Sequence, residues 1–120
     1  MGQEERAIPF YEKSIKLGLD KIYLEEAYLV LGSIYRVTGD YQKSFELLKI
    51  AIQEFPQNNA LLTFYSMTLY NLGRIEEAME ILLQLLATTS TDTNIQDFSK
   101  AILFYYDKLN QTWLAANLKI

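Results

Sequence analysis

The stretch Val30–Ile52, VLGSIYRVTGDYQKSFELLKIAI, decides the fold. Its apolar residues recur at helical spacing, yet it holds two glycines seven residues apart, Gly32 and Gly39. A glycine inside a helix costs about 1 kcal/mol relative to alanine. We predict that Gly32 lies on the inward face of a helix and lets a second helix approach closely, because it has no Cβ. Gly39 follows the apolar Val37, where a helix end favours a residue with positive φ.

The pattern around Gly39 recurs around Gly73, 34 residues later, so that TGDYQKSFELL aligns with LGRIEEAMEIL. The agreement extends to both sides of the glycines. The aligned pairs are Tyr28 with Leu62, Leu31 with Tyr65, Gly32 with Ser66, Tyr35 with Leu69, Ser44 with Ala78, Leu48 with Leu82, and Ala51 with Leu85. A period of 34 residues that contains two helices is typical of one class of helical repeat.

On these residues the sequence resembles the tetratricopeptide repeat family, over about residues 4–92. Residues 25–58 match the family pattern of an aromatic residue, Leu-Gly, Tyr, a small residue, a large apolar residue and Pro. They do so with Tyr28, Leu31, Gly32, Tyr35, Ser44, Leu48 and Pro56. Residues 59–92 form a second repeat, in which Ser90 replaces the proline, and residues 4–17 resemble the second helix of an earlier repeat. The resemblance implies an all-α fold, in which antiparallel helix hairpins stack as a right-handed superhelical solenoid.

We predict helices at residues 4–17, 23–37, 41–54, 59–72, 75–88 and 94–118, all within a single domain of residues 1–120. Asp40, and either Asn58 or Asn59, are candidate N-caps, and Thr93 with Gln96 fits a capping box. An apolar stripe continues along residues 94–118, so we expect residues 93–118 to cap the last repeat, as one helix or as two with a bend near Asp107.

The composition excludes several classes of function. The net charge of −4 disfavours nucleic acid and anionic membranes as partners. The chain has no cysteine, so it has no thiolate to bind a metal. It also has no histidine, which is both the commonest metal ligand and the commonest general base. We therefore expect no metal, no cofactor and no catalytic residues, and we expect Glu76, Glu77 and Glu80 to face solvent. With no apolar leader segment in Met1–Glu12, the expected location is the cytoplasm.

In the tetratricopeptide family, the first helices of the repeats line a concave groove that holds a peptide or helix of a partner protein. The resemblance thus implies a non-enzymatic protein-binding module with a groove of mixed character. Its residues would be Leu29, Ser33, Arg36, Thr63, Met67, Tyr70 and Asn71. The family's carboxylate clamp for chaperone C-termini needs Lys and Asn, but Leu29, Val30, Ser33, Ala60 and Phe64 stand at those places, so we do not expect that ligand.

Two alternatives remain open at this point. Met67 and Tyr70 also fit a packing role, since apolar residues at helical spacing usually belong to a core. The half repeat at the N-terminus, which suggests a missing or replaced segment before it, also favours self-association. A second copy of the chain would then cover Ile8, Phe10, Tyr11 and Ile15.

Overall fold

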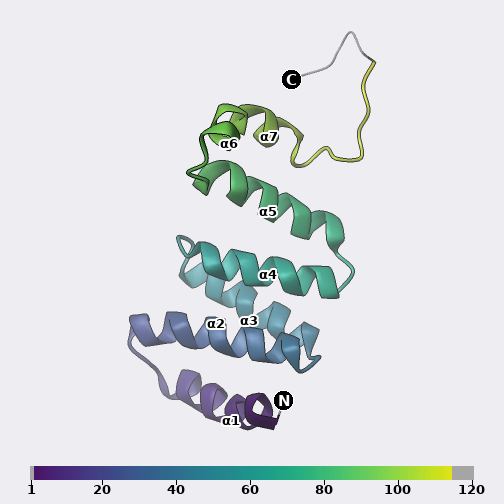
Figure 1. Ribbon diagram of the computed structural model, residues 1–120. Coiled ribbons are helices and arrows are strands. Elements are labelled where there is room, and N and C mark those ends of the chain that lie inside the picture. The colour runs from purple at the N-terminus through teal and green to yellow at the C-terminus, as the bar shows by residue number, and fades with distance from the viewer. Residues whose placement is uncertain (1, 115–120) are drawn as a thin grey trace. The chain divides into compact units, whose positions relative to one another are not determined.

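The described part of the chain, residues 2–114, is built from helices joined by short links (Figure 1). In this computed structural model, side chains are described for residues 6–114. The helices are α1 (Gly2–Leu17), α2 (Lys21–Val37), α3 (Tyr41–Glu54), α4 (Asn59–Asn71), α5 (Ile75–Thr89), α6 (Thr93–Asp97) and α7 (Ser99–Tyr105). No strand occurs among the described residues, so the prediction of an all-α fold is confirmed.

The residues up to Ala78 form one compact unit, and the described residues from Met79 onward form a second. In the first unit α1 packs on α2, α2 on α3 and α3 on α4. The link between α2 and α3 is only three residues long, Thr38–Asp40, so these two helices run in opposite directions. In addition α2 packs directly against α4. Helix hairpins whose first helices are neighbours are the arrangement of a tetratricopeptide-like solenoid.

The α2–α3 hairpin is held together at Gly32, as the sequence predicts. A Cβ atom at this position would lie 2.5 Å from Leu48 Cδ2 and 2.7 Å from Leu48 Cγ. Leu48 is fully buried and belongs to a core cluster with Tyr28, Ala51 and Leu61. The missing side chain of Gly32 therefore provides the space that Leu48 fills.

The ends of α2 and α4 have the same backbone geometry. Gly39 has φ +91° and Gly73 has φ +81°, which confirms the predicted left-handed helix ends. In both, the residue after the glycine donates its N–H to a carbonyl five residues back: Asp40 N to Tyr35 O at 2.8 Å, and Arg74 N to Leu69 O at 2.9 Å. Such bonds satisfy carbonyl groups that the helix leaves free.

The predicted N-caps of α3 and α4 are present. The side chain of Asp40 accepts from Lys43 N at 3.2 Å, and that of Asn58 accepts from Leu61 N at 3.2 Å. The capping box predicted at Thr93 is wrong by one residue. The N-cap is Asp92, which accepts from Ile95 N at 3.0 Å, while Gln96 Nε2 donates to Ser90 O at 3.1 Å.

The prediction of helix throughout 94–118 is wrong. The helix is interrupted at Phe98, nine residues before the expected bend at Asp107, and α7 ends at Tyr105. After Tyr105 the described chain turns and continues without helix to Leu114, and residues 115–118 lie outside the described residues. The turn is favoured because Trp113 packs against Tyr105 at 5.4 Å between ring centroids and against Phe104 at 6.2 Å. Lys108 Nζ also donates to Phe104 O at 2.8 Å, which satisfies a carbonyl near the end of α7.

Candidate partner-binding groove

The seven residues predicted for the groove lie on two helices that pack against each other in the first unit. Leu29, Ser33 and Arg36 belong to α2, and Thr63, Met67, Tyr70 and Asn71 belong to α4. Met67 is 40% exposed and Tyr70 is 63% exposed, so these two side chains are the accessible apolar surface of the set. The other five are half-buried. Leu29 in particular packs against the core cluster, which leaves it mainly a structural role.

Two polar atoms of this set are buried without a hydrogen-bond partner, and both belong to residues near the C-terminal ends of the two helices. They are Arg36 Nε on α2 and Asn71 Oδ1 on α4. A guanidinium N–H can only donate, and an amide oxygen can only accept. In contrast, Thr63 Oγ1 donates to Asn59 O of its own helix at 2.9 Å. One donor and one acceptor of the set are therefore enclosed between side chains without a partner.

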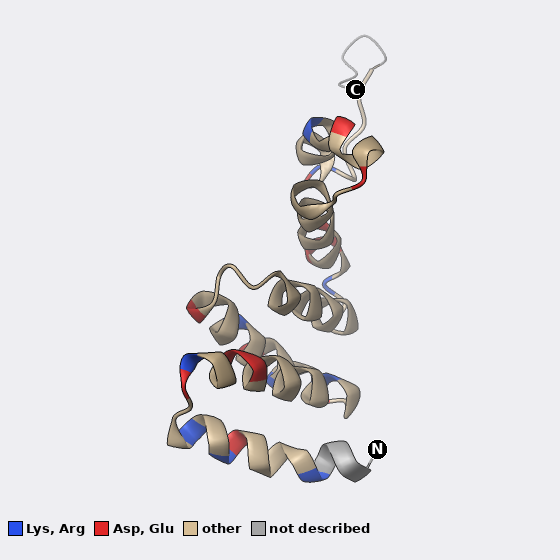
Figure 2. Cartoon of the chain, turned by 60° about the vertical axis from the view of Figure 1, so that its left-hand side comes forward, with Lys and Arg blue, Asp and Glu red and all other residues tan. Residues whose placement is uncertain are grey.

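The electrostatic character of the set comes from a single side chain. Helix α4 contains no Asp, Glu, Lys or Arg, and it is tan throughout in Figure 2. Arg36 is the only charged residue among the seven, and it forms no ion pair within the described residues. A ligand on this face would meet apolar side chains and one positive charge.

A buried chain of hydroxyl groups connects the two helices through α3. Ser44 Oγ donates to Gly32 O at 2.7 Å, and Ser44 Oγ lies 2.8 Å from Thr68 Oγ1. Because the Ser44 hydrogen points at the Gly32 carbonyl, Thr68 is the donor in the second bond. Both hydroxyl side chains are fully buried. Such a fully satisfied buried network favours one spacing of α2, α3 and α4, and hence one geometry of the α2–α4 face.

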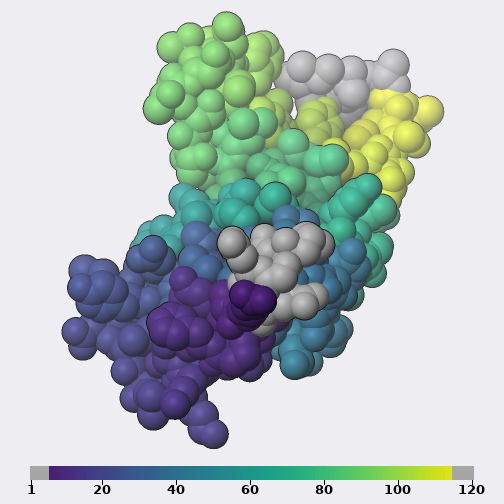
Figure 3. All heavy atoms as spheres, turned by 60° about the horizontal axis from the view of Figure 1, so that its bottom comes forward, coloured from purple at the N-terminus to yellow at the C-terminus, as the bar shows by residue number. Residues whose placement is uncertain are grey.

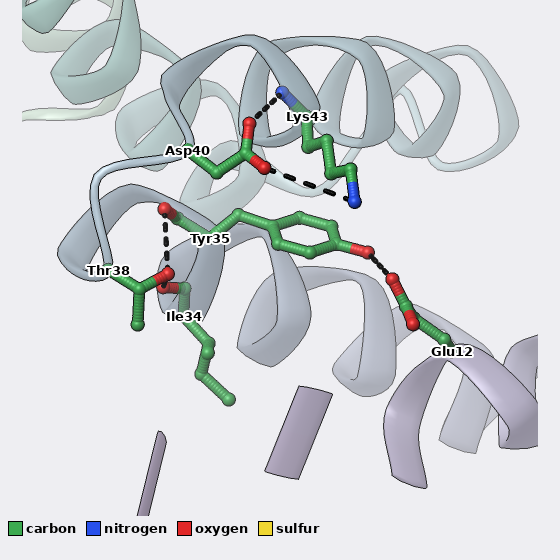
Figure 4. A network of polar contacts seen from close by, with 6 residues as sticks. All are labelled: Glu12, Ile34, Tyr35, Thr38, Asp40 and Lys43. Atoms are coloured by element: carbon green, nitrogen blue, oxygen red, sulfur yellow. Dashed lines mark hydrogen bonds and ion pairs between the residues drawn. The ribbon is translucent and has the colours of Figure 1, made fainter. Parts of the chain in front are cut away.

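The position of α2 relative to α1 depends on Tyr35, whose hydroxyl points at Glu12 of α1 in Figure 4 and donates to its carboxylate. Burial, followed by this bond to Glu12, raises the pKa of Tyr35 above its ordinary value. The same figure shows Thr38, whose Oγ1 donates to Ile34 O at 2.8 Å and lies 3.2 Å from Tyr35 O, at the end of α2. The bond from the Tyr35 hydroxyl to Glu12 therefore holds α2 against α1.

Tyr65 of α4 has a structural role, because its ring packs against an aromatic ring of α3. Phe45 stacks on Tyr65 with ring centroids 5.5 Å apart, and the Arg74 guanidinium lies 4.8 Å from the Phe45 ring centroid. Burial raises the pKa of Tyr65. Arg74 also donates two bonds of 2.8 Å to Glu77, and this contact lowers the pKa of the Glu77 carboxyl. Glu77 is thus an ion-pair partner, and the described residues include no group of three acidic residues placed to hold a metal.

The four residues predicted for self-association do not form one exposed surface. Phe10 is 66% exposed, whereas Ile8, Tyr11 and Ile15 are half-buried. Ile15 packs against the core cluster, and the ring of Tyr11 meets that of Phe10 edge to face at 5.3 Å. Only Phe10 is available to a second copy without rearrangement, and self-association stays a prediction.

Sequence reasoning missed three features of this region. The unpaired atoms of Arg36 and Asn71 follow from packing between helices, which spacing alone does not give. The Ser44–Thr68 bond had a weak signal, because serine stands where the repeat pattern has alanine. Gly18 also adopts a positive φ, +89°, just after α1 ends at Leu17, and its place after the helix was the available signal.

Comparison with known proteins agrees with this architecture. A family model described as "Tetratrico peptide repeat" matches residues 1–103. The chain belongs to the tetratricopeptide repeat family, whose members generally serve as scaffolds for protein–protein interaction. No curated protein matches the chain. Within the described residues, no helix is both long and apolar enough to cross a membrane.

Proposed function

We propose that this protein binds a peptide or helix of a partner protein on the face formed by α2 and α4. The observation that carries the proposal is the exposed apolar surface of Met67 and Tyr70 on α4, a helix without charged residues that packs directly against α2. The half-buried polar residues of the set, including Arg36 and Asn71, lie on the same two helices and supply the polar part of the face.

The two exposed apolar side chains of the proposed site also suit the binding of a peptide or helix. Met67 has a flexible side chain that adapts to irregular surfaces, and Tyr70 offers a large ring with a polar tip. Tyr70 is largely exposed and Met67 is partly exposed, so their burial by a ligand would contribute favourable free energy without disturbing the core. The absence of charge on α4 favours a partner segment that is apolar where it contacts this helix.

A displayed library of random peptides tests the proposal. We expect binders that lose at least about 10-fold in affinity with Met67→Lys or Tyr70→Lys, since each change places a charge in an apolar contact. The matched control is Ile50→Lys, which adds the same charge at an exposed apolar position of α3. A library without binders, or binders insensitive to both groove variants, would refute the proposal.

The proposed activity is binding alone, without catalysis, cofactor or metal, and the proposed compartment is the cytoplasm. The support is the composition, since the chain has no cysteine and no histidine. A turnover that persists through purification to homogeneity and is lost in a groove variant would contradict the non-enzymatic assignment.

Self-association is the alternative, and the exposure of Phe10 is the observation that favours it. Light scattering across a wide range of protein concentration distinguishes the two. A constant monomer mass supports partner binding, whereas a dimer mass that Phe10→Ser reduces to that of the monomer would support self-association.

A further inference from the structure

The seam between α1 and α2 contains a pocket of about 260 Å³ that none of the seven groove residues lines. In Figure 3, where the view is turned toward this end of the first unit, α1 (purple) and the start of α2 (blue) lie next to each other. The lining residues are Phe10, Tyr11 and Ser14 of α1, Leu19 of the link, and Tyr23, Glu26 and Ala27 of α2.

Aromatic rings form much of the wall. Phe10 is 66% exposed and Tyr23 is 62% exposed, although large aromatic side chains usually bury most of their surface. Tyr11, the third ring, is half-buried and held edge to face against Phe10. Ring faces attract cations within about 6 Å, because the π system is negative at its centre.

The charge of the pocket has one sign. Glu26 is exposed, and it forms no hydrogen bond or ion pair with any described residue. Its neighbour Glu25 differs, since it accepts from Asn58 Nδ2 at 2.8 Å and is committed to the α2–α4 contact. No Lys or Arg lines the pocket. The result is an apolar, aromatic hollow with a single unpaired carboxylate.

We infer that this pocket binds the side chain of a lysine presented by a partner protein. The four-carbon stem packs on Leu19, Ala27 and the rings, and the ammonium group lies against the ring faces and the Glu26 carboxylate. The net charge of −4 attracts a basic partner at longer range. This binding site is independent of the groove, because no residue is shared between them.

The test is to titrate the full chain with Nα-acetyl-lysine methylamide as the probe and to monitor binding by the amide chemical shifts in NMR spectra. Nα-acetyl-norleucine methylamide has the same stem without the charge and serves as the matched ligand. We expect the lysine probe to shift amides around Tyr11, Tyr23 and Glu26 and to bind at least about 5-fold more tightly than the norleucine probe. Raised salt should weaken the lysine probe selectively.

Variants assign the effect to the pocket. We expect Glu26→Gln and Tyr23→Leu each to weaken the lysine probe by about 2- to 5-fold, while Glu46→Gln, an exposed carboxylate on α3, has no effect. Both pocket residues are exposed, so these variants keep the fold, which circular dichroism verifies. Equal affinity for the two probes would overturn the inference and indicate an apolar occupant. Shifts that depend on protein concentration without any probe would overturn it in favour of a second copy of the chain.

Discussion

The substitution Gly32→Ala measures how closely α2 and α3 approach. The new methyl group would lie 2.5 Å from Leu48 Cδ2, and Leu48 is fully buried and cannot turn into solvent. Overpacking costs about 1–3 kcal/mol, while alanine improves helix propensity by about 1 kcal/mol. We expect a net loss of up to about 2 kcal/mol in the free energy of unfolding, measured in urea.

A double-mutant cycle identifies the cause. Leu48→Ala alone should cost about 2–5 kcal/mol through the cavity it leaves. In that background Gly32→Ala no longer meets the leucine, so only its gain in helix propensity should remain, which corresponds to a coupling of about 1–3 kcal/mol. The exposed Gln53→Ala should be additive with Leu48→Ala. An additive result for Gly32 as well would contradict the contact.

Gly39 tests a different property of glycine, its backbone freedom. No atom lies within 4 Å of a Cβ built at Gly39, so a larger residue meets no clash there. The cost of Gly39→Ala should come only from its left-handed φ of +91°, which is about 1–2 kcal/mol. We expect Gly39→Asn to cost less, because asparagine tolerates this conformation better. Equal losses in urea denaturation for the two variants would argue against the backbone explanation.

Single residues were predictable from the sequence where the repeat pattern fixes them. Gly32 occupies a place where only a small residue fits, and Gly39 and Gly73 occupy places that need a left-handed backbone conformation. Their spacing alone therefore predicted the close helix contact and the two helix ends. The Ser44–Thr68 bond was not predictable, because it depends on which way two hydroxyl groups point after three helices have packed.

At the scale of elements, the Tyr35–Glu12 bond predicts how the α1–α2 pair responds to alkali. The pKa of Tyr35 is raised in the folded protein, by burial first and then by Glu12, and burial also raises the pKa of Tyr28 and Tyr65. Since folding favours the neutral phenols, their contribution is complete below the ordinary pKa of about 10. It is lost as the pH rises above that value toward the folded pKa.

We therefore expect the free energy of unfolding to fall as the pH rises above about 10, and to fall less steeply in Tyr35→Phe. The measurement is urea unfolding at several pH values, with Tyr70→Phe as the control on an exposed tyrosine. Parallel pH profiles for Tyr35→Phe and the parent would show that Tyr35 does not contribute.

The segment after α7 shows where periodicity fails. Tyr105 and Trp113 lie at a spacing that continues a helical stripe, but here they cluster with Phe104 because the chain turns and brings Trp113 back. A stripe of apolar residues predicts that they gather on one side. It does not distinguish a helix from a turn that achieves the same burial.

Trp113 is the only tryptophan and so reports on this cluster directly. We expect Phe104→Ala to shift its fluorescence emission to longer wavelength, because the indole loses a neighbouring ring and gains water. Far-ultraviolet circular dichroism should change little, since residues 106–114 contain no helix to lose. Leu103→Ala, at the exposed neighbouring position, should leave the emission unchanged, and an equal shift there would contradict the cluster.

At the scale of the whole molecule, the sequence placed the seven candidate groove residues on α2 and α4, which pack against each other, because a 34-residue period determines which helices are equivalent. It did not distinguish the residues within the set. Leu29 turned out to pack on the core and Tyr70 to be exposed, a difference that arises from how far each helix is rotated about its own axis. The lysine pocket was not predictable, since it depends on the shape of the seam between α1 and α2.

If residues 1–120 form a single domain, as we propose, the two compact units should unfold together. The repeat of residues 59–92 includes α4 in the first unit, and α5 begins in that unit and continues into the second. Because neighbouring repeats stabilise one another, we expect one unfolding transition, with the same urea midpoint for Trp113 fluorescence and for helical circular dichroism. Gly32→Ala provides the decisive comparison, since it changes the core of the first unit whereas Trp113 lies in the second. In a single cooperative domain this substitution lowers the midpoint reported by Trp113 as much as that of the helical signal. If the Trp113 midpoint stays at the parent value, the two units unfold independently and the chain is two domains.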